Sequence, residues 1–170
     1  LGNQIFWVCP LIEESKKVDH SSAVKKSEYL NKLFPNQVFL LHGKTTSEEK
    51  EKILNKFLKN EFKILVSTTI IEVGIDFPNA NVIIIENANK FGLSQLHQLR
   101  GRVGRGSKES SCILMFKSNL SDNAKKRINI LKHSNDGFKI SEEDMKLRGF
   151  GDILGFKQSG IKNFRLADPI

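Results

Sequence analysis

Cysteines are scarce in this sequence, and long apolar runs are absent. The two cysteines, Cys9 and Cys112, each lie in an apolar stretch, which favours buried free thiols over a disulfide. Two cysteines cannot make a four-ligand structural zinc site without histidines spaced to help, and none are. No run approaches the roughly 20 apolar residues that span a bilayer, and no basic segment followed by an apolar one opens the chain. These absences predict a soluble, cytoplasmic protein with no membrane partner. The length of 170 residues predicts about one domain.

Complete phosphate-binding motifs are missing as well. Gly43-Lys44-Thr45 is similar to the end of a P-loop, but the glycine that a P-loop requires at position 38 is Val38 here. The glycines of 149–155 are spaced one residue too widely for a dinucleotide fingerprint. No acidic pair follows a predicted strand to hold Mg²⁺, and we expect no metal-binding residues in this chain. The sequence therefore predicts an ATPase-like fold without the groups that grip a triphosphate and its metal.

Positive charge is concentrated in one segment. Of the net charge of +8, most lies in residues 94–133, which hold nine lysines and arginines against two acidic residues. Residues 1–93 hold twelve against eleven, and residues 134–170 hold six against six. A local basic patch favours a polyanion partner, either nucleic acid or a nucleotide phosphate. For the lysines of 44–63, which alternate with glutamates, a solvated helix surface is the simpler interpretation.

Short apolar runs alternate with helical patterns over the first 116 residues. Five unbroken runs, rich in β-branched or aromatic residues, are typical of strands buried on both faces: 5–12, 38–41, 63–68, 81–87 and 112–116. Between them, the apolar spacing predicts helices at about 21–34, 47–59 and 94–103. This alternation predicts an α/β fold, a mostly parallel sheet with flanking helices.

The second helix and the end of the chain carry further signals. Thr46 and Glu49 form a capping box at the start of the helix. Its apolar face is predicted from Ile53, Leu54, Phe57 and Leu58. After residue 116 the pattern changes to two helical stretches, at about 121–133 and 141–147, and a glycine-rich loop. We therefore divide the chain into a sheet domain at 1–117 and a small helical hairpin with its tail at 118–170.

The stretch QLRGRVGRG at 98–106 places three arginines among three glycines. On a helix that begins near residue 94, one side is apolar and faces the sheet: Leu96, Leu99 and Val103. The other side is polar: Gln98, Arg102 and Arg105. A guanidinium binds phosphate at two points and keeps its charge, and glycines allow another surface to come close. An isolated R-x-x-R is more often a nucleic-acid contact or a salt-bridge network, but its setting here favours a nucleotide phosphate.

Several motifs resemble those of superfamily-two helicases. Gln98-x-x-Gly101-Arg102-x-x-Arg105 resembles motif VI, and residues 67–76 (STTIIEVGID) resemble motif V. Residues 6–15 (FWVCPLIEES) resemble motif IV, and His42-Gly43 matches the HG that ends the next strand. The resemblance implies a RecA-like fold and identifies the chain as similar to the second of two RecA-like lobes. The Walker A and acidic motifs would then belong to the first lobe.

Further stretches resemble the RecG family of ATP-dependent, branched-DNA helicases. They are LHQLRGRVGRG (96–106), SNDGF (134–138), LRGFGDILGFKQSG (147–160) and FRLADP (164–169). The transcription-repair coupling translocases share motif VI and part of the tail, but usually have tyrosine where this chain has His97, and lack SNDGF and FRLADP. A RecA-like module that only binds nucleic acid is a further alternative. The intact set of Arg102, Arg105 and Asp76 argues against it.

The resemblance implies roles for individual residues at the ATP site. Arg102 and Arg105 would be arginine fingers that close over the γ-phosphate of ATP, whose Mg²⁺ and phosphate cradle belong to the first lobe. Gln98 would lie beside them. Gly74 and Asp76 match motif V positions that approach the nucleotide and the fingers. We assign Arg100 no catalytic role. The lobe alone is expected to hydrolyse no ATP.

The same resemblance implies contacts to DNA. His42, Gly43 and Thr68 match positions that contact a DNA phosphate. Arg127, Arg148 and Gln158 match positions that couple translocation to hydrolysis in the family's hairpin. The implied partners are branched or forked DNA, the first RecA-like lobe and a fork-binding domain of the parent chain. The implied function is DNA repair, recombination and the processing of stalled forks.

Overall fold

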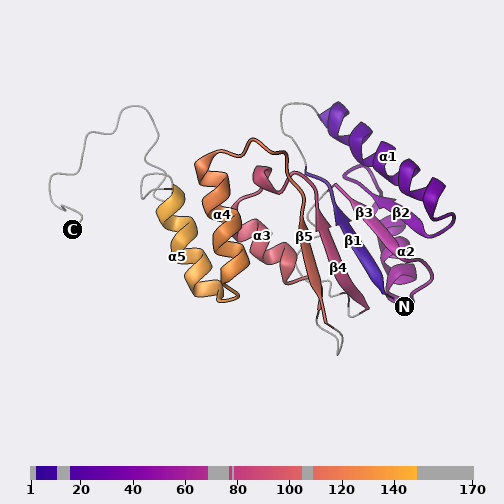
Figure 1. Ribbon diagram of the computed structural model, residues 1–170. Helices are drawn as coiled ribbons and strands as arrows, with labels where there is room; N and C mark the ends of the chain where they lie inside the picture. Colours follow the sequence, from indigo (N-terminus) through magenta and orange to yellow (C-terminus); the bar gives the residue numbers. More distant parts are fainter. Residues whose placement is uncertain (1–2, 11–15, 69–76, 78, 105–108, 149–170) are drawn as a thin grey trace, which may run out of the picture.

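The computed structural model of the chain shows a sheet flanked by helices (Figure 1). The structure describes residues 3–10, 16–68, 77, 79–104 and 109–148, with the backbone alone at 16–22 and 148. The elements in chain order are β1 (Gln4–Val8), α1 (Lys16–Leu33), β2 (Val38–Leu41), α2 (Ser47–Leu58), β3 (Ile64–Ser67), β4 (Ala80–Ile85), the 3₁₀ turn η1 (Ala88–Lys90), α3 (Leu93–Arg100), β5 (Ser111–Leu114), α4 (Asp122–His133) and α5 (Gly137–Arg148).

The strands form one sheet in the order β2-β3-β1-β4-β5, and every neighbouring pair is parallel. This confirms the predicted α/β fold class and the five predicted strands. Because the strands are parallel, all of them begin at one edge of the sheet and end at the other. We call these the amino edge and the carboxyl edge. Parallel strands need crossover connections, and three of the four connections between consecutive strands contain a helix that the sequence predicts: α1, α2 and α3.

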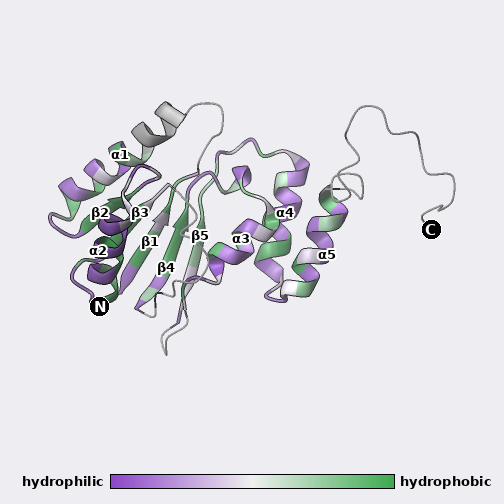
Figure 2. Cartoon of the chain, turned by 180° about the vertical axis from the view of Figure 1, so that it is seen from behind, coloured by the Kyte–Doolittle hydropathy of each residue, from purple (hydrophilic) through white to green (hydrophobic). Residues whose placement is uncertain are grey.

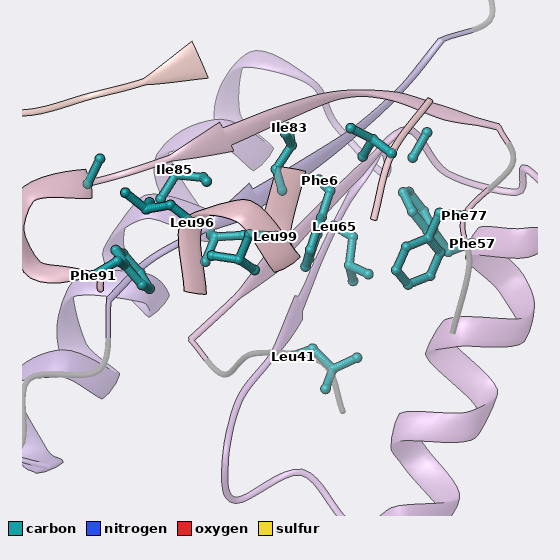
Figure 3. Packing of buried hydrophobic residues seen from close by; sticks show 14 of the residues in the cluster. Phe6, Leu41, Phe57, Leu65, Phe77, Ile83, Ile85, Phe91, Leu96 and Leu99 are labelled. Carbon is teal, nitrogen blue, oxygen red and sulfur yellow. The ribbon is translucent and has the colours of Figure 1, made fainter. Parts of the chain in front are cut away.

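The two faces of the sheet bury different helices. On one face, Leu54 and Phe57 of α2 and Leu96 and Leu99 of α3 pack into a large apolar cluster with strand residues such as Phe6. Figure 3 shows Leu96 and Leu99 directed into the same core as Phe6 and Leu65. On the other face, Ala23 and Leu30 of α1 pack against Val38, Ile64 and Val66. Hydrophobic residues are correspondingly concentrated in the strands, whereas the helices carry hydrophilic stretches (Figure 2).

The start of α2 follows the sequence prediction closely. Thr46 Oγ1 accepts a hydrogen bond from Glu49 N at 3.3 Å, and Glu49 Oε2 accepts one from Thr46 N at 3.2 Å, which completes the capping box. Leu54 and Phe57 are buried as predicted. Leu58 is exposed instead, because the helix ends there and its side chain lies beyond the core face.

The helix of motif VI is shorter than predicted. It was expected to continue to about residue 103, but α3 ends at Arg100 and Gly101 is its C-cap. Leu96, Leu99 and Val103 are buried as expected. Arg102, however, lies in the turn that follows, so it does not share a helical face with Gln98. Glycine is a poor helix residue, and two glycines in four positions favour a turn over continued helix.

Two helices follow the sheet, as the sequence predicts. They are α4 and α5, joined by a short turn at residues 134–136. The hairpin they form packs against α3, on the side away from α1 (Figure 1). Ser121 caps α4, where its Oγ accepts a hydrogen bond from Ala124 N at 3.3 Å. The glycine-rich tail lies outside the described residues.

Both cysteines are free. Cys9 is buried, and burial, followed by the charge of Glu86, raises its pKa to about 12. Cys112 on the edge strand β5 is only half-buried, so the predicted burial holds fully for Cys9 alone. Burial also raises the pKa of the Cys112 thiol.

Candidate nucleotide and nucleic-acid site

The turn after α3 brings Arg102 to the amino edge of the sheet. Gly101 N donates to His97 O at 3.0 Å, and Arg102 N donates to Leu99 O at 3.0 Å, so the turn continues directly from the helix end. Gly104 N then donates to Ala80 O at 3.2 Å, at the start of β4. Arg102 is therefore held between the end of a helix and the first residue of a strand.

The Arg102 side chain has no hydrogen-bond or ion-pair partner within the described part of the chain. It is half-buried, and Gln98, four residues earlier on α3, is exposed. A guanidinium always carries its charge and has five donors, so one without an internal partner is available for an anion. The other candidates for this site, Arg105, Gly74 and Asp76, lie outside the described residues.

The two described glycines of this motif differ in what their positions require. Gly104 has a φ of +78°, in the left-handed region, and a Cβ there would overlap Ser110 Oγ and lie 2.5 Å from Ser110 Cβ. Gly101 has ordinary helical dihedrals, and a Cβ there would lie 3.6 Å from its nearest neighbours. The Gly104 requirement is thus internal to the fold, since Ser110 fills the space beside it. Only at Gly101 does the absent side chain leave room for another surface.

Arg100 is used inside the protein, in agreement with its assignment to no catalytic role. Its Nη1 donates to the carbonyl oxygens of Leu131, at 2.7 Å, and Ser134, at 2.9 Å. Its Nη2 lies 3.0 Å from His97 Nδ1. No local pattern in the sequence predicts that this arginine joins α3 to the hairpin. No spacing rule predicts a contact between residues that are more than 30 positions apart.

The candidate DNA residues lie at the opposite edge. His42 follows β2 and Thr68 follows β3, and the pairing of Leu41 with Ser67 makes them neighbours at the carboxyl edge. Thr68 N donates to Leu41 O at 3.1 Å. The structure thus brings His42, Gly43 and Thr68 together. Thr68 is only 4% exposed, so little of its surface is available to a phosphate.

The turn after β2 uses most of its own amides. Thr45 Oγ1 accepts from His42 N at 3.1 Å, and His42 Nδ1 accepts from Lys44 N at 3.1 Å. In the first turn of α2, the capping box satisfies Glu49 N, and the acidic side chains of Glu48 and Glu49 lie in the same turn. These carboxylates make the N-terminus of α2 unfavourable for an anion, because they offset the positive end of the helix dipole. Gly43, which is exposed, is the residue of this turn best placed to offer a backbone amide.

The hairpin contains the remaining candidates. Arg127 donates from Nη1 to Phe91 O at 2.9 Å and from Nη2 to Asn89 O at 3.3 Å, which fastens α4 to the segment before α3. Arg148 is the last residue of α5, and its side chain lies outside the description, as does all of Gln158. Four lysines of the basic segment are exposed: Lys117, Lys125, Lys126 and Lys132.

Two general findings bear on cofactors and membranes. Over residues 3–148, apart from the gaps given above, no group of three or more histidine, cysteine, aspartate or glutamate side chains could hold a metal ion. No helix in the part that the structure describes is long and apolar enough to cross a membrane.

The five-stranded parallel sheet with helices on both faces is the RecA-like fold of a helicase C-terminal lobe. The chain belongs to the family described as helicase conserved C-terminal domain, which matches residues 2–107. A second match covers residues 134–168 and is to the C-terminal part of domain 3 of the ATP-dependent DNA helicase RecG.

Individual relatives point the same way. The chain is 53% identical to the ATP-dependent DNA helicase RecG of Synechocystis sp., over 99% of this chain and 20% of that protein. It is 48% identical to the RecG of Bacillus subtilis, over 99% of this chain and 25% of that protein. The chain therefore spans about a fifth to a quarter of the length of these curated relatives. These names favour the RecG family over the transcription-repair coupling translocases.

Solved structures confirm the fold. A structure of RecG bound to a three-way DNA junction matches with a TM-score of 0.74 at 47% identity, over 89% of this chain and 20% of that chain. The helicase Lhr of Mycobacterium smegmatis, bound to single-stranded DNA and AMP-PNP, matches with a TM-score of 0.59 at 17% identity, over 76% of this chain and 17% of that chain. The second match shows a shared fold alone.

Proposed function

We propose that this chain is the C-terminal motor lobe of an ATP-dependent helicase that acts on branched DNA in the cytoplasm, in repair, recombination and the processing of stalled forks. Residues 1–117 would form the RecA-like lobe, and residues 118–170 the hairpin and tail that couple hydrolysis to translocation. The proposal is supported by the identity to RecG proteins over nearly the whole chain and by the guanidinium of Arg102, which has no partner among the described residues.

The role proposed for Arg102 is to stabilise negative charge on a phosphoryl group during transfer. ATP and Mg²⁺ would be held by the first lobe, and Arg102 of this chain would supply a cation. Arg105 would act beside Arg102, and Gln98, Gly74 and Asp76 would help to orient both. Arginines in such positions accelerate other nucleotide hydrolases by ~10³- to 10⁵-fold.

The DNA contacts would be made at the carboxyl edge and along the hairpin. His42, whose Nδ1 accepts a hydrogen bond from Lys44 N, would lie beside the DNA phosphate. Gly43 and Thr68 would bind the same strand. Arg127, Arg148 and Gln158 would transmit hairpin movement. Nucleotide and DNA would thus contact opposite edges of one sheet, and closure of the two lobes on ATP could change the grip on DNA.

The test is ATP hydrolysis by the complete parent chain with forked DNA, comparing wild type with Arg102→Lys. Lysine keeps the charge but loses the planar fork, so we expect kcat to fall by ~10³-fold or more, with DNA affinity unchanged. Near-normal turnover would remove the arginine-finger role. It would leave QLRGRVGRG as a structural or nucleic-acid-binding patch in a module that only binds.

A further inference from the structure

The C-terminal end of α3 is fastened to the tip of the hairpin by one side chain. Arg100 Nη1 donates to Leu131 O and Ser134 O, which lie in the last turn and at the C-cap of α4. Carbonyls at a helix C-terminus have no intrahelical donor and carry the negative end of the helix dipole. A guanidinium satisfies two of them at once. We call Arg100, His97, Leu131, Ser134 and Gly137 the α3–hairpin joint.

The first residue of α5 packs against His97 of the joint. Gly137 begins this helix, and a Cβ at that position would lie 3.2 Å from His97 Nε2, so the ring packs directly on the backbone. His97 Nδ1 faces Arg100 Nη2, which can only donate, and the ring must therefore accept and be neutral. Arg100 is thus held between a histidine of its own helix and two carbonyls of the hairpin.

Arg102 is only two residues from this joint. The turn that contains Arg102 is held to the sheet at its C-terminal end, where Gly104 N donates a hydrogen bond to Ala80 O. A movement of the hairpin relative to the sheet would pull on Arg100 while Gly104 stayed in place. The three residues between these two anchors would have to change conformation, and Arg102 is the central one.

We propose that Arg100 is a positioning residue for ATP hydrolysis, which sets the location of Arg102 by fastening α3 to the hairpin. This inference rests on the proposed function. It gives the hairpin a direct mechanical connection to the arginine finger. DNA bound to the exposed lysines of α4 would alter turnover through the same side chain.

The experiment measures kcat and KM for ATP in the complete parent chain with forked DNA, for wild type, Arg100→Lys and Arg102→Lys. Arg100 reaches the two carbonyls from Nη1 and His97 from Nη2, whereas lysine carries all of its donors on one nitrogen and cannot occupy both positions. We expect Arg100→Lys to lower kcat by about 10- to 100-fold, because a small misplacement of a catalytic group has effects of that size, while KM changes by less than about 3-fold.

Leu30→Ala is a control for stability. Leu30 of α1 is 5% exposed and packs with Val38 and Ile64 on the face of the sheet opposite α3, away from Arg102. We expect this variant to lower Tm, because it removes buried apolar contacts, and to leave kcat unchanged. Equal losses of kcat in Leu30→Ala and Arg100→Lys would show a purely structural role and overturn the inference.

The outcomes also separate the two proposals. If Arg102→Lys abolishes turnover and Arg100→Lys does not reduce it, the positioning role fails and the finger role stands. If Arg102→Lys turns over normally, both fail. Should Arg100→Lys not fold, Gly137→Ala tests the joint from the hairpin side by displacing His97. Unchanged kcat in that variant would also overturn the inference.

Discussion

Single residues in the QLRGRVGRG stretch carry distinct requirements. Arg100 binds backbone carbonyls, whereas Arg102 has no partner among the described residues. The sequence assigned a catalytic role to Arg102 and none to Arg100 from their motif positions, and the role of Arg102 stays a prediction. It could not distinguish the glycines in the same way, because the need for glycine at 104 depends on Ser110, whose approach is set by the return of the chain to β5.

This difference between glycines gives a stability prediction. Gly104→Ala should lower the free energy of unfolding by about 1–3 kcal/mol, because it places a Cβ at positive φ and against Ser110. Gly101→Ala should change it by less than about 0.5 kcal/mol in either direction, since the position has helical dihedrals and a Cβ there would make only ordinary van der Waals contacts, at 3.6 Å. Urea unfolding of both variants measures the contrast. Equal losses of unfolding free energy at the two positions would show that Gly104 lacks the positive φ and the close contact with Ser110.

At the scale of elements, strands and helices were largely predictable, and their ends were not. Apolar runs and the capping box located β1 to β5 and the start of α2. The end of α3 was misplaced by three residues, because the buried Val103 extends the apolar period beyond the helix. The contact of Ser94 with the buried Asp144, which joins α3 to α5, has no local sequence signal at all.

The packing of α3 on the hairpin predicts a pH dependence. Burial, followed by the charge of Arg100, lowers the pKa of His97 from its ordinary value of 6.5. Below pH 6.5 the unfolded chain binds a proton at His97 more readily than the folded chain does. Stability due to this residue is therefore present above pH 6.5 and is lost as the pH falls toward the folded-state pKa.

The measurement compares urea midpoints of wild type and His97→Gln from about pH 7.5 to about pH 5. Glutamine keeps an acceptor and does not titrate, so the other ionisable groups cancel in the difference between the two proteins. We expect wild type to lose more stability than His97→Gln on acidification. Parallel profiles would mean that His97 is not held neutral in the joint.

Across the whole molecule, the two proposed sites lie at opposite edges of the sheet. Arg102 lies at the amino edge, and the cluster of His42, Gly43 and Thr68 lies at the carboxyl edge. This separation follows from topology: α3 returns from the carboxyl edge to the amino edge before Arg102. The motif order indicated the fold, but only the structure shows that the two groups are at opposite edges.

We propose that this lobe supplies half of an ATP site and that the other half lies in the rest of the parent chain. ATP hydrolysis by the 170-residue chain alone and by the complete parent chain, each with and without forked DNA, tests this division. We expect turnover by the complete chain only, stimulated by forked DNA. Turnover by the 170-residue chain that persists in Arg102→Lys would contradict it, because that chain would then contain a complete site of its own.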